Sequence, residues 1–181
     1  MSKAVMLSIR PKWCEKIING DKTIEVRKTR PKMETPFKCY IYCTLPKYPH
    51  EDFIATDYPR PQFYGGGKVI GEFTCDRIYE LETKAHGGSY YVKGEDWLTA
   101  REVAQQSCLT LKDMHDYLHA QKGYGWHITD LRIYDAPKCL FEFWAERLCR
   151  REPSVFGCGE CCDCDKRAPQ SWCYVEAMDN G

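Results

Sequence analysis

Residues 20–27 read Gly-Asp-Lys-Thr-Ile-Glu-Val-Arg and follow a short predicted helix. The second half of this stretch alternates aliphatic and charged residues, which predicts a strand. Because side chains two positions apart on a strand share a face, Glu25 and Arg27 should project together while the aliphatic residues face the core. Lys22 lies at the preceding turn. A carboxylate beside a permanent cation stays ionised, so the stretch is a candidate site for a polar ligand.

A strand and a helix precede this stretch. The apolar residues 5–9 predict the strand, and Pro11 suits the first turn of a helix because its φ is fixed and it has no amide donor. Gly20 stands where a left-handed residue would end that helix. The helix has one apolar face, made of Trp13, Cys14, Ile17 and Ile18.

The remaining elements follow from periodicity and from turn residues. Thr110 and Asp113 form an N-capping pair at the start of a helix. The expected order is a strand at 37–44, a long surface connection at 45–67, one long or bent strand at 68–81, helices at 97–106 and 110–119, and a strand at 124–134. This order predicts an α+β fold built as a small mixed β-barrel with flanking helices.

Composition is consistent with one domain and an appendage, since the chain has 181 residues of which 43% are hydrophobic. The net charge is zero, so the whole chain lacks the polybasic signature of nucleic-acid binding. The first 32 residues, however, carry nine Lys and Arg against three Asp and Glu, a balance of plus six. This asymmetry fits either an anionic ligand or a solvated face.

The N-terminus lacks the apolar core of a signal peptide, because Arg10, Lys12 and Glu15 interrupt it. No apolar run reaches the length of a membrane span, so a cytoplasmic location is expected. In that compartment the twelve cysteines should be buried thiols or metal ligands rather than a disulfide framework. Cys39 and Cys43 fall on one face of a strand and are expected to be buried thiols.

Residues 149–181 form a cysteine-rich extension that is too short and polar to fold alone without a metal. The two-residue spacing within it is typical of a zinc knuckle, with free thiols or an iron site as alternatives. The expected structural zinc ligands are Cys158, Cys161, Cys164 and Cys173, with Cys162 as an alternate and Cys149 as a further candidate. Residues 168–176 have strand character and could pack back near Tyr40 or Trp144.

The sequence L-S-I-R-P-K-W at 7–13, followed by residues 20–27, resembles the ASCH family, and residues 124–138 resemble its closing strand and loop. The resemblance implies a barrel domain of the PUA-like superfamily at 1–148. It also implies a cleft between the first helix and the strand at 22–27 that binds RNA or a modified nucleotide. No membrane or protein partner is predicted.

The cleft offers groups suited to a nucleotide. Lys22 and Arg27 could hold a phosphate or a carbonyl, Glu25 could accept from a base amino group, and Trp13, Tyr64 or Trp126 could stack on a base. The alternatives are a structural Glu25–Arg27 ion pair, core tryptophans and, for His127, a hydrogen-bonded structural role. The candidate ligand-binding residues are Arg10, Lys12, Trp13, Lys22, Glu25, Arg27 and Trp126.

The resemblance also bears on catalysis, for which Lys22 and Glu25 are the candidates. Some ASCH-like proteins hydrolyse an acylated cytidine with a lysine, a threonine three residues later and a glutamate on a later helix. Here Glu25 replaces that threonine, and the later helix offers Asp113 and Asp116, so the departure argues against amide hydrolysis. RNA or nucleotide binding is therefore the expected function. A nucleoside hydrolase, a ribonuclease and a protein-interaction module are the alternatives.

Overall fold

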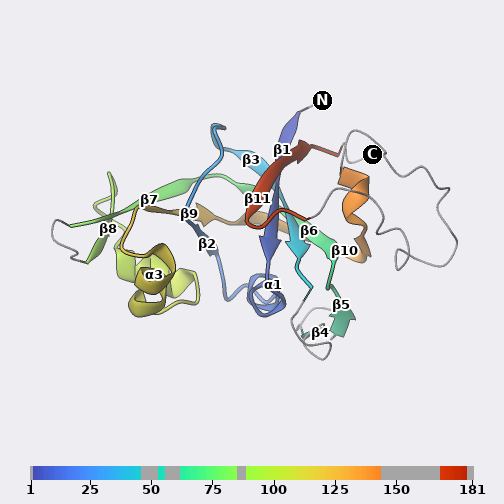
Figure 1. The fold of residues 1–181 in the computed structure, drawn as a ribbon, viewed down its shortest axis with the longest axis horizontal. Helices are drawn as coiled ribbons and strands as arrows, with labels where there is room; N and C mark the ends of the chain where they lie inside the picture. The colour runs from blue at the N-terminus through green and yellow to red at the C-terminus, as the bar shows by residue number, and fades with distance from the viewer. Residues whose placement is uncertain (1, 46–52, 56–61, 85–88, 144–167, 179–181) are drawn as a thin grey trace, which may run out of the picture.

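The computed structural model describes residues 2–45, 53–55, 62–84, 89–143 and 168–178, which form two main sheets and three α-helices (Figure 1). The larger sheet has the order β10 (Thr129–Lys138), β6 (Lys68–Cys75), β3 (Phe37–Cys43), β1 (Lys3–Ile9) and β11 (Trp172–Glu176). The smaller sheet has the order β2 (Ile24–Arg27), β9 (Gly123–His127), β7 (Ile78–Thr83) and β8 (Tyr90–Val92). The predicted α+β class is confirmed.

The helices cover the sheets at different places. α1 (Pro11–Ile18) follows β1 directly, whereas α2 (Ala100–Gln106) and α3 (Leu111–Leu118) lie together beside the smaller sheet (Figure 1). Within 45–67, expected to be a connection, β4 (Phe53–Ala55) pairs with β5 (Gln62–Tyr64) as a two-stranded ribbon. A short 3₁₀ helix, η2 (Leu140–Phe143), follows β10. None of these described helices is long and apolar enough to cross a membrane.

Three apolar clusters pack between or against the sheets and helices. The inter-sheet cluster joins β1, β3, β6 and β9 to α1 and includes Val5, Leu7, Ile17, Phe73 and Trp126. The helix cluster joins the smaller sheet to α2 and α3 and includes Ile24, Val26, Leu81, Val103 and Met114. The outer cluster covers the other face of the larger sheet and includes Met6, Tyr40, Phe143 and Val175. The central strands β1 and β3 are therefore buried on both faces, as their near-continuous apolar sequences require, whereas β10 has no buried residue.

α1 agrees with its expected pattern. Cys14, Ile17 and Ile18 are buried and Trp13 is partly buried, so the predicted apolar face is the one that packs. Gly20 follows the helix with φ +78°, a left-handed conformation that glycine adopts at little cost. The turn that carries Lys22 is thus set directly behind the helix.

Two segments that were each predicted to be one strand form two strands in the structure. Residues 68–81 form β6 and β7, and residues 124–134 form β9 and β10, with the two members of each pair in different sheets. Only two residues separate β6 from β7 and one residue separates β9 from β10, so the sequence shows no clear break between the strands of each pair. The closed barrel is also not observed: in the described part of the chain, no strand pairing joins the two sheets.

The C-terminal strand confirms the strand character predicted for 168–176. β11 pairs antiparallel with β1 from Lys3↔Glu176 to Leu7↔Trp172 and forms an edge of the larger sheet. The Met178 backbone N–H donates to the Tyr40 hydroxyl at 2.7 Å, which bears out the expected contact near Tyr40. Trp144, the other expected neighbour, lies outside the described residues.

Candidate functional site

β2 places Glu25 and Arg27 between the two sheets. Its aliphatic residues Ile24 and Val26 belong to the helix cluster, so the charged pair takes the opposite face, as the alternation predicts. Both charged side chains are nevertheless buried, each residue being 7% exposed. The sequence did not show this burial, because it depends on β1 and the C-terminal strand covering that face.

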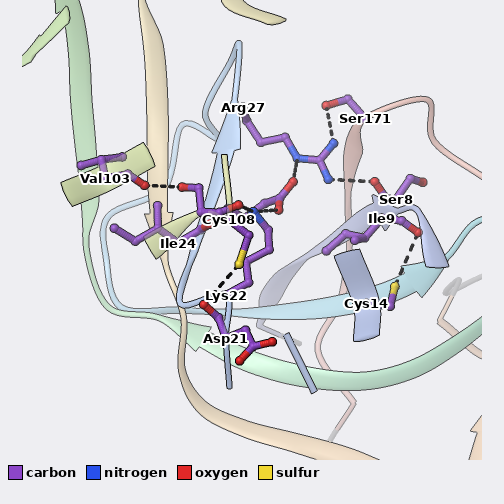
Figure 2. A network of polar contacts seen from close by, with 12 residues as sticks. Ser8, Ile9, Cys14, Asp21, Lys22, Ile24, Arg27, Val103, Cys108 and Ser171 are labelled. Atoms are coloured by element: carbon purple, nitrogen blue, oxygen red, sulfur yellow. Dashed lines mark hydrogen bonds and ion pairs between the residues drawn. The ribbon is translucent and has the colours of Figure 1, made fainter. Parts of the chain in front are cut away.

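Lys22 is also buried, at 3% exposure, and its ammonium group is fully used (Figure 2). Its Nζ donates to the carbonyls of Ile24 and Ser107, both at 2.9 Å, and lies 3.1 Å from Glu25 Oε2. An ammonium group has three hydrogens, and these contacts account for all of them. Lys22 therefore ties β2 to the end of α2 and holds Glu25, with no hydrogen left for a ligand.

Arg27 is the second cation on Glu25. Its Nε lies 3.0 Å from Glu25 Oε1, an ion pair in which the N–H is not aligned as a hydrogen bond. Its Nη2 donates to the Ser8 carbonyl at 2.8 Å and its Nη1 to Ser171 Oγ at 3.4 Å (Figure 2). Each Nη carries a second hydrogen. Arg27 thus keeps donor capacity that Lys22 lacks.

Glu25 is held as a carboxylate. Burial by itself would raise the pKa of Glu25, but the positive charges of Lys22 and Arg27, together with the Lys22 hydrogen bond, outweigh burial and lower it. Each carboxylate oxygen faces one cation and has a second lone pair. Glu25 can therefore still accept a hydrogen bond.

These residues line a cavity of about 460 Å³, within the size range of small-molecule sites. The Trp13 ring forms part of its wall and carries two cations, with Lys12 Nζ 4.3 Å and Lys22 Nζ 5.3 Å from the ring centroid. The wall comes from five parts of the chain: Ser8, Ile9, Arg10, Trp13, Lys22, Glu25, Val26, Arg27, Thr44, Leu109, Tyr117, Gln170 and Ser171.

The cavity brings together five of the seven predicted ligand-binding residues, Arg10, Trp13, Lys22, Glu25 and Arg27. Lys12 is exposed and reaches the site only through the Trp13 ring. Trp126 is not in the wall: it is 0% exposed and packs in the inter-sheet cluster, where its ring cannot stack on a base in the cavity. Burial between the sheets, which the sequence could not show, explains this difference.

Two further candidates lie elsewhere. His127 Nδ1 is 2.7 Å from Asp76 Oδ1, which fits the structural interpretation of this histidine. Tyr64 belongs to β5, and its side chain lies outside the described residues.

The structure adds wall residues that the sequence did not suggest. Tyr117 comes from α3, and burial raises its pKa while the charge of Arg27 opposes that rise. Gln170 and Ser171 come from the segment just before β11, 143 and 144 residues after Arg27 in the chain. No local pattern could have indicated residues that reach the site through sheet pairing.

The described cysteines are mostly buried thiols. Cys39 and Cys43 are free and buried as predicted, and burial raises the pKa of the Cys39 thiol. Cys139 is disulfide-bonded, which corrects the expectation that the cysteines are only thiols or metal ligands. Cys173 packs against the outer cluster, and burial raises its pKa to about 11.

The metal-site prediction falls largely outside the structure. Cys149, Cys158, Cys161, Cys162 and Cys164 lie outside the described residues. Within the described ranges, no group of three or more His, Cys, Asp or Glu residues could hold a metal ion. The predicted zinc site therefore stays a prediction.

Comparisons with known proteins identify the fold. No protein-family model and no curated protein sequence matches the chain. Among solved structures, the chain is similar to ASCH from Zymomonas mobilis, with a TM-score of 0.57, 16% identity, and coverage of 96% of this chain and 87% of that chain. Two mutants of the same protein give TM-scores of 0.57 and 0.56 at 16% and 18% identity, covering 97% and 96% of this chain and 91% and 88% of theirs. The chain therefore has the fold of an ASCH domain.

Proposed function

We propose that the chain binds RNA or a modified nucleotide in the cavity between β2, α1 and the C-terminal segment. The observation that carries this proposal is the buried Glu25, which two cations keep ionised in the wall of a cavity of about 460 Å³. A buried acceptor beside the guanidinium of Arg27 can pair with the polar edge of a nucleobase, because such an edge carries both donors and acceptors.

The other wall residues suit the rest of a nucleotide. Trp13 is partly exposed at the cavity and can stack on a base. Arg10 is exposed at the same wall, where its guanidinium can bind a phosphate, with Lys12 beside the Trp13 ring. The three cations Arg10, Lys22 and Arg27 exceed the one carboxylate, so the cavity wall as a whole favours an anion.

The same geometry argues against catalysis by Lys22. A nucleophile or a general acid needs a proton or lone pair that can reach the substrate. All three hydrogens of Lys22 are engaged by protein acceptors, namely the carbonyls of Ile24 and Ser107 and the Glu25 carboxylate. Binding rather than hydrolysis is therefore proposed.

The test is the salt dependence of RNA binding. A labelled single-stranded oligoribonucleotide should bind with an affinity that falls steeply as salt rises. Arg10→Ala should weaken binding and lower the slope of log K against log salt by about one phosphate contact. Because Arg10 is exposed, the variant should remain folded.

Lys84→Ala is the matched control, since Lys84 is exposed and is not part of the cavity wall. It should leave both the affinity and the salt slope close to those of the wild type. Binding that is absent, insensitive to salt or equally affected by the two substitutions would refute the proposal.

Zinc binding by the cysteine-rich segment is a separate proposal. Cys158, Cys161, Cys164 and Cys173 remain the candidate ligands, with Cys162 as an alternate and Cys149 as a further candidate. Elemental analysis of protein purified without chelator should give about one zinc per chain. Less than about half an equivalent would contradict the site.

A further inference from the structure

The segment before β11 forms one wall of the cavity. The Ser8 backbone N–H donates to the Ser171 carbonyl at 2.9 Å, and Ser8 Oγ donates to the Pro169 carbonyl. Ser8 is buried at the second-to-last position of β1, two residues before Arg10. These bonds extend the β1–β11 pairing past the strand and lay residues 169–171 along the cavity.

The backbone of this segment is anchored by groups other than the side chains that line the cavity. β11 continues the pairing with β1, and Trp172 Nε1 donates to Thr29 Oγ1 at 2.9 Å. Removing the side chain of Gln170 or Ser171 should therefore leave the path of the segment unchanged. Their side chains are then available for a role other than folding.

Ser171 and Gln170 both line the cavity and have unused hydrogen-bonding capacity within the described part of the chain. Ser171 Oγ accepts from Arg27 Nη1 at 3.4 Å, and its own hydrogen has no acceptor among the described residues (Figure 2). Gln170 is an exposed residue of the cavity wall, and its side-chain amide makes no hydrogen bond within the described part of the chain. An amide offers two donors and one acceptor oxygen.

Contacts run continuously from Glu25 through Arg27 to Ser171. Along this line the wall offers an acceptor on Glu25, donors on Arg27 and a donor on the Ser171 hydroxyl. The pattern of donors and acceptors differs between the edges of the bases, so a fixed row of this kind can tell them apart. The C-terminal segment supplies the end of the row.

We propose that Gln170 and Ser171 are specificity residues, which contact the base and decide which nucleotide the cavity prefers. This inference rests on the proposed function, since it names residues that act in the same cavity. When a side chain that hydrogen-bonds the favoured base is removed, a polar group of that base is left unpaired. The affinity for that base then falls relative to the other bases. We expect each residue to contribute roughly tenfold to the preference for the favoured base.

The experiment compares the affinities of the four ribonucleoside 5′-monophosphates for the wild type, Ser171→Ala and Gln170→Ala by calorimetry. The wild type should prefer one base, and each variant should reduce the ratio between the best and the worst by roughly tenfold. Gln105→Ala is the control, because Gln105 is exposed on α2 outside the cavity wall. Arg10→Ala should weaken all four ligands by a similar factor, as expected for a phosphate contact.

The outcomes separate the two claims. If the wild type binds none of the four monophosphates, this inference fails, whereas the proposed function fails only if the oligoribonucleotide does not bind either. If it binds all four equally, or if the variants keep the wild-type preference, binding stands and the specificity role is refuted. Circular dichroism and thermal melting of each variant verify that it is folded, and deletion of residues 169–181 is avoided because β11 is part of the larger sheet.

Discussion

Glu25→Gln is expected to lower the free energy of unfolding by about 3–5 kcal/mol, because it leaves buried cations without their counter-charge. Lys22 and Arg27 flank the carboxylate at 3.1 and 3.0 Å, and all three residues are almost fully buried. Glutamine has nearly the same shape, so the loss reports the charge rather than a cavity. Urea unfolding of the two proteins measures the difference.

Glu34→Gln is the matched control, since Glu34 is exposed and forms no ion pair within the described part of the chain. Its effect should stay within about 0.5 kcal/mol. A Glu25→Gln variant as stable as this control would show that the buried charges are not coupled as the structure describes.

The same carboxylate should make stability depend on pH. The pKa of Glu25 is lower in the folded protein than in the unfolded chain, where a glutamate titrates at about 4.3. The stabilisation is therefore fully present above that value and is lost as the pH falls through the folded-state pKa. Glu25→Gln should remove this component, so the stability difference between wild type and variant should shrink on acidification.

Lys22→Met is the second substitution expected to have a large effect, also about 3–5 kcal/mol. It removes the ammonium group that neutralises Glu25 and that satisfies the carbonyls of Ile24 and Ser107. The side chain of methionine can fill the space of the lysine stem, so the loss reflects the missing hydrogen bonds and charge. Urea unfolding again measures it.

The double variant Lys22→Met/Glu25→Gln tests whether the two residues act as a unit. Removing both charges avoids leaving either one without the other. The double variant should therefore lose about 1–3 kcal/mol less free energy of unfolding than the two single variants lose in sum. Strict additivity would contradict a direct ion pair. It would also reopen a role for Lys22 in contacting the ligand.

Part of the site could be predicted from sequence because its geometry is local. Strand alternation placed Glu25 and Arg27 on one face, and helix periodicity placed Trp13 on the packing face of α1. Their burial could not be predicted, because it depends on Ser8 and Ser171 approaching from β1 and from the C-terminal segment. Local sequence periodicity does not reveal contacts between residues that are distant in the chain.

Lys22 shows the same limit for a single residue. At a turn, strand phase does not determine where a side chain points, so sequence suggested a ligand-binding lysine. Its partner Ser107 is 85 residues away, at the end of α2. Once this carbonyl, the Ile24 carbonyl and Glu25 are in place, the ammonium group is saturated and its role is structural.

The strand prediction was wrong where one continuous apolar segment contributes strands to two sheets. β6 and β7 are separated by two residues and β9 and β10 by one, so the strand character on either side of each bend reads as one strand. The bend sends β7 and β9 to the smaller sheet with β2. That arrangement creates the space between the sheets where Glu25 and Arg27 lie.

The most direct test of nucleotide binding in this cavity is a crystal structure of the protein with a short single-stranded oligoribonucleotide. We expect one base inside the cavity, within hydrogen-bonding distance of Glu25 and Arg27, and a backbone phosphate at Arg10. An oligonucleotide bound elsewhere on the protein, with the cavity empty of it, would contradict the proposal.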